Sequence, residues 1–244
     1  MIAIITAMEV EFMSFYKQIR IEGKADVPTG GIFRATLKGK DVVAIQSGIG
    51  EERAIRAVRF LIEKYSVRFI ISTGVAGALS PELRTGDIVI GEKVLSRKGM
   101  FYSNKAMVTN CTESCKELGM KYITGVILTS AEFIASNSKK KSLHEEYGAM
   151  AVEMESAFIA EYAAGKGIPF LVIRAISDTA DTSFNIDFQK IEKNGKITFL
   201  RYLAYFSLHP LLYLELRKHR EACSKAVSHL YPLIKEVINR LSVF

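Results

Sequence analysis

The sequence predicts one layered α/β domain built around a single sheet. Short apolar runs bounded by turn residues recur along the first 180 residues, and several are continuous, as in strands that helices cover on both faces. Segments with helical periodicity separate these runs. The 244-residue chain shows no internal repeat and no linker, and one α/β domain can reach this length.

The expected elements follow the apolar pattern in chain order. Strands are expected over residues 2–7, 41–48, 68–77, 86–91, 123–130, 149–154 and 169–177. Between the second and third of these runs, residues 51–65 predict a helix. Its apolar stripe is expected to consist of Ile55, Val58, Phe60, Leu61 and Ile62.

The C-terminal segment 185–244 has a different character and is expected to form a helical extension packed on a single domain spanning 1–244. After the turn signal Asn194-Gly195, residues 196–208 and 209–241 both show helical periodicity. Pro210 is expected to open the second helix, and Pro232 to bend or break it. Leu, Tyr and Phe at core spacing favour packing on the body, with a membrane surface or a partner as the alternative.

Charge and cysteine content limit the class of protein. Most of the net charge of +7 lies in the C-terminal segment, where a solvated helix face is the simplest interpretation. Nucleic acid is disfavoured, because no aromatic and basic recognition motif accompanies the charge. Three cysteines without paired spacing, an opening unlike a signal peptide and no apolar run of roughly 20 residues predict a cytoplasmic protein.

Candidate site residues directly follow the apolar runs, because ligands of open α/β sheets bind outside the carboxyl ends of strands. They are Glu9, Glu11, the SGIG of 47–50, the TGVAG of 73–77, residues 132–134, 153–155 and 174–178. The glycines allow close backbone approach to a ligand, although tight turns explain them equally well. Neither G-x-G-x-x-G nor a P-loop is present, which disfavours dinucleotide and nucleoside triphosphate sites.

Metal and nucleophilic-serine chemistry are also disfavoured. The four histidines lie away from the strand ends, and neither His-x3-His nor Cys-x2-Cys occurs. Cys111 and Cys115 are interpreted as structural. No G-x-S-x-G motif supports a Ser-His-Asp triad. No metal and no organic cofactor are therefore expected.

Carboxylates remain as candidates for the chemistry. Cleavage of a glycosidic bond needs an acid for the leaving group and a base for the attacking water. Glu11 and Asp178, at different strand ends, could form that pair. They could equally be buried structural partners of Arg174, and the residues alone leave both interpretations open.

Seven motifs in order resemble those of the 5′-methylthioadenosine/S-adenosylhomocysteine nucleosidases, within the purine nucleoside phosphorylase superfamily. They are AMEVE (7–11), SGIG (47–50), TGVAGAL (73–79), GDIVI (86–90), AEFI (131–134), VEMESAFIA (152–160) and RAISDTAD (174–181). The resemblance covers about 180 residues. It implies a three-layer α/β/α fold with a mixed central sheet, commonly as a homodimer.

The resemblance also implies a role for each matching residue around a purine. Asp178 would protonate or hydrogen-bond adenine N7, with Ser177 orienting it and Arg174 supporting the network. Phe133 would stack on the base, and the Ile134 backbone would read its edge.

The same resemblance places the sugar and the attacking water. Glu155 would hold the ribose hydroxyls with Met154 beneath the sugar, whereas neighbouring Glu153 is expected to be structural. Glu11 would activate the water. The pocket for the 5′ substituent would be lined by Met8, Ile49 and Phe188.

Departures from the family pattern leave alternatives. Val75 stands where these nucleosidases have a small hydroxyl residue, and Ser72 and Val75 replace an arginine and a serine that hold phosphate in the phosphorylases. Water is therefore favoured as the co-substrate over phosphate, with phosphorolysis of a purine nucleoside or adenosyl-lipid second. A nucleoside-binding module without catalysis is third.

The segments outside these motifs also differ from the family. Residues 96–122 are shorter than the corresponding segment and lack its histidine and aromatic cluster. The C-terminal segment resembles the end of hopanoid-associated phosphorylase-like proteins, which implies peripheral membrane contact through basic helices.

Overall fold

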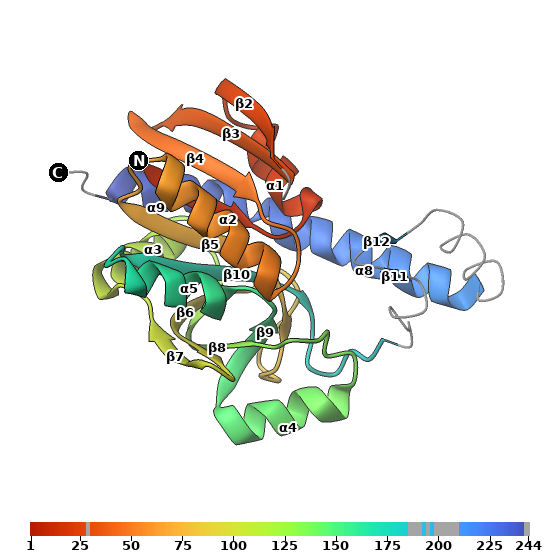
Figure 1. Cartoon of the computed structure of the whole chain (residues 1–244). Helices are drawn as coiled ribbons and strands as arrows, with labels where there is room; N and C mark the ends of the chain where they lie inside the picture. Colours follow the sequence, from red (N-terminus) through yellow and green to blue (C-terminus); the bar gives the residue numbers. More distant parts are fainter. Residues whose placement is uncertain (28–29, 185–191, 194–195, 198–209, 242–244) are drawn as a thin grey trace.

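A mixed sheet with helices on both faces dominates the computed structural model, which describes residues 1–27, 30–184, 192–193, 196–197 and 210–241 (Figure 1). The strands are β1 (Ile2–Thr6), β2 (Ile21–Val27), β3 (Gly30–Leu37), β4 (Lys40–Gln46), β5 (Phe69–Ala78), β6 (Ile88–Ser96), β7 (Gly99–Tyr102), β8 (Tyr122–Thr129), β9 (Ala149–Glu153), β10 (Phe170–Asp178), β11 (Glu192–Lys193) and β12 (Lys196–Ile197). The helices are α1 (Glu9–Tyr16), α2 (Glu51–Lys64), α3 (Lys105–Glu117), α4 (Asn137–Tyr147), α5 (Ser156–Gly165), α8 (Pro210–Ser228) and α9 (Leu230–Arg240). The predicted three-layer fold class is confirmed.

Every strand expected from an apolar run is present. The structure adds β2, β3 and β7, which lack a long apolar run because parts of each face solvent. The predicted helix over 51–65 forms as α2, and Val58 and Leu61 of the predicted stripe are buried. The other buried residues of α2 are Ala54 and Ala57, whereas the predicted Ile55, Phe60 and Ile62 are only half-buried. Small residues turn inward there because α2 packs closely against α5.

Strand β5 is the centre of the sheet, and its pairings position the candidate site. It pairs in parallel with β1 on one side and with β10 on the other, and its last residues pair antiparallel with β9. Because β10 also continues through β6 and β8 back to β9, these five strands form a closed ring of pairings. Strands β1, β4, β3 and β2 extend from β5 as the open part of the sheet.

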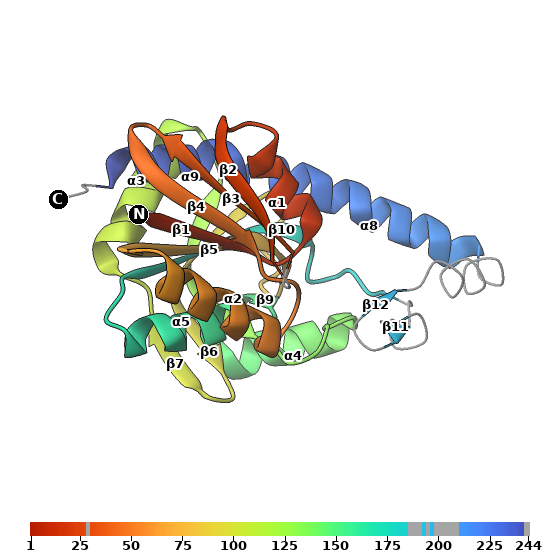
Figure 2. The same cartoon turned by 45° about the horizontal axis from the view of Figure 1, so that its top comes forward.

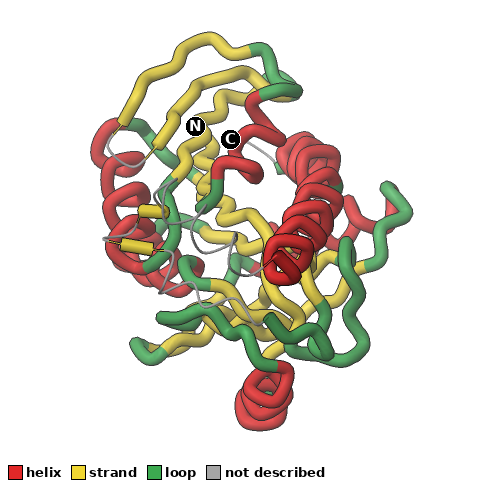
Figure 3. Tube along the Cα trace, turned by 90° about the vertical axis from the view of Figure 1, so that its right-hand side faces the viewer, coloured by secondary structure: helices red, strands yellow, loops and turns green. Residues whose placement is uncertain are grey.

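Alternate residues of the buried strands enter two hydrophobic cores. Ile2 and Ile4 of β1 face α1, α3 and α9, whereas Ala3 and Ile5 face α2 and α5. Figures 2 and 3 show these two groups of helices on opposite sides of the strands. The double coverage explains why the apolar runs are continuous rather than alternating.

The described part of the C-terminal segment contacts the strands and helices of the body. Helix α8 begins at Pro210, as predicted, and it contacts β10 and α1. The helix is interrupted at His229, between α8 and α9. Pro232 follows in the first turn of α9, where proline is tolerated. The helix expected over 196–208 is wrong at Lys196 and Ile197, which form β12 against β11; its other residues lie outside the described part.

Candidate functional site

One cavity of about 140 Å³ lies at the carboxyl ends of β1, β5, β9 and β10, where the sequence places its candidate residues. Its walls contain all the predicted site residues except Arg174 and Phe188. These wall residues are Met8, Glu11, Ile49, Phe133, Ile134, Met154, Glu155, Ser177 and Asp178. Arg174 lies behind the wall, and Phe188 lies outside the described residues.

Glu11 lies in the first turn of α1, and main-chain N–H groups fix its carboxyl. Its Oε2 accepts from the N–H groups of Ala7 and Met8 at 2.9 and 2.8 Å, and its Oε1 accepts from the N–H of Val75 at 2.8 Å. Burial raises the pKa of the Glu11 carboxyl, while these donors and the Arg174 charge oppose that rise. The three main-chain donors therefore fix the orientation of the carboxyl in the cavity wall.

Glu155 stands at the junction of β9 and α5, facing the cavity. Its Oε1 accepts from the N–H of Gly50 at 2.8 Å, a contact that the loop after β4 makes possible by turning at Gly48 and Gly50, both with positive φ. Burial, and next the charge of Glu153, raises the pKa of Glu155 to about 8. A group that develops positive charge beside Glu155 would favour its ionised form.

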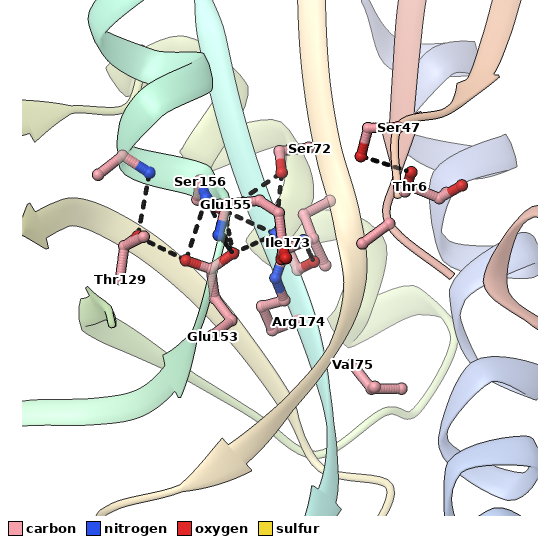
Figure 4. Close-up of polar contacts among 12 residues, drawn as sticks. Thr6, Ser47, Ser72, Val75, Thr129, Glu153, Glu155, Ser156, Ile173 and Arg174 are labelled. Carbon is pink, nitrogen blue, oxygen red and sulfur yellow. Dashed lines mark hydrogen bonds and ion pairs between the residues drawn. The ribbon is translucent and has the colours of Figure 1, made fainter. Parts of the chain in front are cut away.

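Glu153 has a different environment, although only one residue separates it from Glu155. It accepts from Arg174 Nη2 at 2.7 Å, from Thr129 Oγ1 at 2.5 Å, and from the backbone and hydroxyl of Ser156 (Figure 4). Arg174 also donates to Ser72 Oγ and Ser156 Oγ, at 2.9 and 2.6 Å. This network fixes the start of α5, as the expected structural role of Glu153 requires.

Asp178 ends β10 beside the cavity, with both carboxyl oxygens engaged. Oδ1 lies 2.7 Å from Ser177 Oγ, and Oδ2 lies 2.5 Å from Lys140 Nζ. A Cβ at Gly77 would approach Oδ2 to 3.0 Å, so a side chain at this position of β5 would crowd the carboxyl. A Cβ at Gly74 would overlap the Glu11 carboxyl in the same way. The TGVAG glycines thus make room for two acids.

Two residues near the cavity are absent from the sequence prediction. Lys140 of α4 is fully buried and paired with Asp178. It belongs to a run of three lysines that suggests an exposed helix face, but it lies one turn before buried Leu143, and that spacing was the available signal.

The second unpredicted residue is His219 of α8, which lines the cavity. Its ring contacts Phe184 edge to face at 4.7 Å, and Phe184 in turn lies 5.4 Å from the Phe133 ring. Cys223, one turn along α8, lies 3.5 Å from His219 Nε2, and burial raises the pKa of its thiol to about 12. Phe133 and His219 therefore line the cavity, and the Phe184 ring lies between their rings.

A smaller cavity of about 10 Å³ lies behind Glu11. Its lining includes Ser72, Thr73, Glu155 and Arg174. The Thr73 Oγ1 atom is buried without a partner among the described residues. A polar space of this size holds about one water molecule.

Five carboxyl groups line this cavity, from Glu11, Glu132, Glu153, Glu155 and Asp178. No group of three or more His, Cys, Asp or Glu in the described part of the chain could hold a metal ion. Also within that part, no helix is long and apolar enough to cross a membrane. The site can stabilise a positive charge and exchange protons with a bound molecule.

Known proteins share both the sequence pattern and the fold. A model of the phosphorylase superfamily matches residues 1–204. The chain is 34% identical over 208 residues to a 5′-methylthioadenosine/S-adenosylhomocysteine nucleosidase of Shewanella sediminis, a match that covers 78% of this chain and 90% of that protein. It is 30% identical over 216 residues to the nucleosidase of the same name from Staphylococcus aureus, with coverages of 81% and 95%.

Solved structures agree in fold at lower identity. The nucleosidase from Neisseria meningitidis in complex with methylthio-immucillin-A superposes with a TM-score of 0.80 at 22% identity, covering 98% of this chain and 99% of that one. Futalosine hydrolase of Helicobacter pylori gives a TM-score of 0.79 at 19% identity, with coverages of 98% and 97%. The last two comparisons establish the fold alone.

Proposed function

Because the chain belongs to the 5′-methylthioadenosine/S-adenosylhomocysteine nucleosidase family of the phosphorylase superfamily, we propose that it hydrolyses the N-ribosidic bond of a 5′-modified adenosine and releases adenine. The observation that carries this proposal is the convergence of Glu11, Glu155 and Asp178 on one cavity. Loss of adenine leaves positive charge on the sugar and negative charge on the base, and the three carboxyls can meet both needs.

Glu155 would stabilise the sugar. Its carboxylate would accept from the ribose hydroxyls and attract the oxocarbenium-like charge, which exists in the transition state and not in the neutral substrate. Burial and the charge of Glu153 raise the pKa of Glu155 to about 8. Hydrogen bonds from the ribose hydroxyls and the developing positive charge would favour its ionised form as the reaction proceeds.

Asp178 would act on the leaving base. A proton on its carboxyl would pass to purine N7, so that adenine leaves as a neutral molecule. Ser177, 2.7 Å from Oδ1, would hold the carboxyl in that orientation. General-acid catalysis of this kind is typically worth roughly 10²- to 10⁴-fold in rate.

Glu11 would take the proton of the attacking water. The small cavity behind it has room for about one water and none for phosphate. Arg174, the nearest buried guanidinium, is engaged by Glu153, Ser72 and Ser156. These contacts favour hydrolysis over phosphorolysis, which remains the second candidate.

The apolar walls would select the substrate. Phe133, 41% exposed at the cavity mouth, would stack on the purine, with the Ile134 backbone at its edge and Met154 under the sugar. Met8 and Ile49 would contact the 5′ substituent. Phe188 stays a prediction for that pocket.

The decisive experiment measures adenine release from methylthioadenosine with and without phosphate. We expect release without phosphate, and Asp178→Asn should lower it by at least about 100-fold in a protein that still folds, as circular dichroism would show. Strict dependence on phosphate would establish a phosphorylase instead. No release from any adenosyl compound would favour a binding module, and a fully active Asp178→Asn would remove the acid role from Asp178.

We further propose a single cytoplasmic domain that forms a homodimer and uses no cofactor besides water. The described face of α8 that carries Arg217, Lys218, Arg220 and Lys225 is exposed, whereas its Cys223 face is buried. Any membrane contact in this part would therefore be electrostatic. Light scattering tests the dimer, and sedimentation with anionic vesicles at two salt concentrations tests the membrane contact.

A further inference from the structure

Lys140 is a buried lysine whose ammonium group meets the proposed general acid. Its side chain is 0% exposed, and Nζ lies 2.5 Å from Asp178 Oδ2. Nζ also donates to the carbonyl oxygens of Thr179 at 2.9 Å and Thr182 at 3.0 Å. Helix α4 thus delivers one cation to the end of β10 and to the loop that follows it.

These three contacts suit two different positions of one proton. An ammonium donates to both carbonyls and to the Asp178 carboxylate. A neutral amine keeps two N–H groups for the carbonyls, and its lone pair then accepts the O–H of a protonated Asp178. The proton can therefore lie on either side of the 2.5 Å contact without the loss of a hydrogen bond.

Ser177 allows the same exchange at the other carboxyl oxygen. Its Oγ lies 2.7 Å from Asp178 Oδ1 and 3.2 Å from the carbonyl oxygen of Ala76. The hydroxyl can donate to a carboxylate, or turn to Ala76 when Asp178 carries a proton. Both sides of the carboxyl thus tolerate the change in protonation that a general acid undergoes.

We propose that Lys140 is a positioning residue that stores the proton which Asp178 delivers to the leaving base, an inference that rests on the proposed function. The C1′–N bond breaks and its electron pair moves onto the purine. The Nζ proton of Lys140 moves to Oδ2 of the Asp178 carboxylate, and the carboxyl proton of Asp178 then passes to the purine nitrogen.

The proton balance closes within the same cycle. Lys140 ends as an amine and Asp178 as a carboxylate. The water oxygen is bonded to C1′, and the water proton lies on Glu11. Exchange with solvent after adenine leaves returns a proton to Lys140 and removes one from Glu11.

Other ionisable groups near Asp178 contribute to any pH profile of the enzyme. The cavity is also lined by Glu11, Glu132, Glu153, Glu155 and His219, with Arg174 behind Glu153 and Cys223 on α8. On the other side of Lys140, the ring centroid of Phe184 lies 5.6 Å from Nζ and carries no charge. A change confined to Lys140 leaves all of these groups in place, so differences between variants report on the pair.

The test compares kcat/KM from pH 5 to 10 for the wild type, Lys140→Met and Lys139→Met. Lys139 is the exposed neighbour on the same helix, so its variant is a matched control for charge. We expect the alkaline limb of Lys140→Met to begin at least about one pH unit lower, because Asp178 alone must then hold the proton. Above that limb the rate falls roughly tenfold per pH unit, while KM changes little at pH 6.

The direction of the movement separates proton storage from simpler roles. A limb that stays in place indicates a purely structural lysine, and a limb that moves to higher pH indicates a lysine that only keeps Asp178 ionised; either result overturns the proposal. Lys140→Arg is the second variant, since guanidinium keeps the charge but does not release its proton. Lys140→Arg should lose kcat/KM at the same alkaline pH as Lys140→Met. A wild-type pH profile in Lys140→Arg would also overturn the proposal.

Failure of the proposed function would look different. If the wild type releases no adenine, or if Asp178→Asn keeps full activity, the nucleosidase mechanism fails at its own step. If the wild type is active and Asp178→Asn is not, while folded Lys140→Met keeps the wild-type alkaline limb, only the role of Lys140 is lost.

Discussion

At the scale of single residues, the partners of Glu153 and Glu155 explain why two acids separated by one residue behave differently. Glu153 faces Arg174 and the start of α5 and is satisfied there. Glu155 has one main-chain donor, from Gly50, and faces the cavity. A buried carboxyl with few donors holds its proton more strongly, as the raised pKa of Glu155 indicates.

This raised pKa predicts how Glu155 affects stability. In the unfolded chain its carboxyl ionises near pH 4.5, whereas in the folded protein it does so near pH 8. The stabilising contribution of its protonated form is complete below pH 4.5 and is lost as the pH rises through about 8. Glu155→Gln cannot ionise, so its free energy of unfolding should fall less between pH 5 and 8 than that of the wild type. The difference is at most about 4 kcal/mol.

Urea unfolding at pH 5, 6.5 and 8 measures this difference. Glu63→Gln, a change at an exposed carboxyl on α2, is the matched control and should follow the wild type. Equal pH dependence in the wild type and Glu155→Gln would show that Glu155 is ionised throughout this range.

The sequence predicts the position of some site residues but not of others. The positions of Glu11, Glu155 and Asp178 follow from strand ends, because a strand end fixes where the next side chain points. Lys140 and His219 could not be placed in this way, since α4 and α8 reach the site from distant parts of the chain. Their contacts depend on tertiary packing that no local pattern contains.

At the scale of elements, β5 is shaped by the acids on either side of it. A methyl group at Gly74 would overlap the Glu11 carboxyl and displace it from the Val75 N–H. Gly74→Ala should therefore lower kcat for adenine release by about tenfold or more, because misplacing a catalytic group by a fraction of an ångström is costly.

Gly165→Ala provides the matched control for this prediction. A Cβ at Gly165, at the end of α5, meets no atom within 4 Å, and alanine favours helix more than glycine does. Its activity and melting temperature should equal or exceed those of the wild type. Wild-type kinetics in Gly74→Ala would show that Glu11 can move without loss of rate.

Elements differ in how well the sequence predicts them. Long apolar runs gave strands at the right places because burial on both faces demands them. The inward face of α2 was predicted correctly at Val58 and Leu61. Ala54 and Ala57 were missed because large side chains suggested the core, whereas close packing on α5 favours alanines. Edge strands such as β2 and β7 depend on pairing with a neighbour, which local composition does not encode.

At the scale of the whole molecule, α9 joins the C-terminal segment to the main core. Leu230, Leu233, Ile234, Val237 and Ile238 are buried in the same cluster as residues of β1, α1 and α3. The pairing of β5 with β10, which closes the ring of strands, lies between this cluster and the second core. Periodicity could predict neither this pairing nor the packing of α9, because every strand buried on both faces has the same apolar pattern.

This shared core predicts that the chain unfolds as one unit. Ile234→Ala should lower the free energy of unfolding by about 2–5 kcal/mol through loss of burial and an internal cavity. Asn239→Ala, at an exposed position of the same helix, should stay within about 0.5 kcal/mol of the wild type. Because α9 packs on α1 and α3, far-UV circular dichroism, tyrosine fluorescence and loss of adenine release should report one coincident transition in each variant. A separate early transition in Ile234→Ala, with activity retained after it, would show instead that the C-terminal helices form an independent unit.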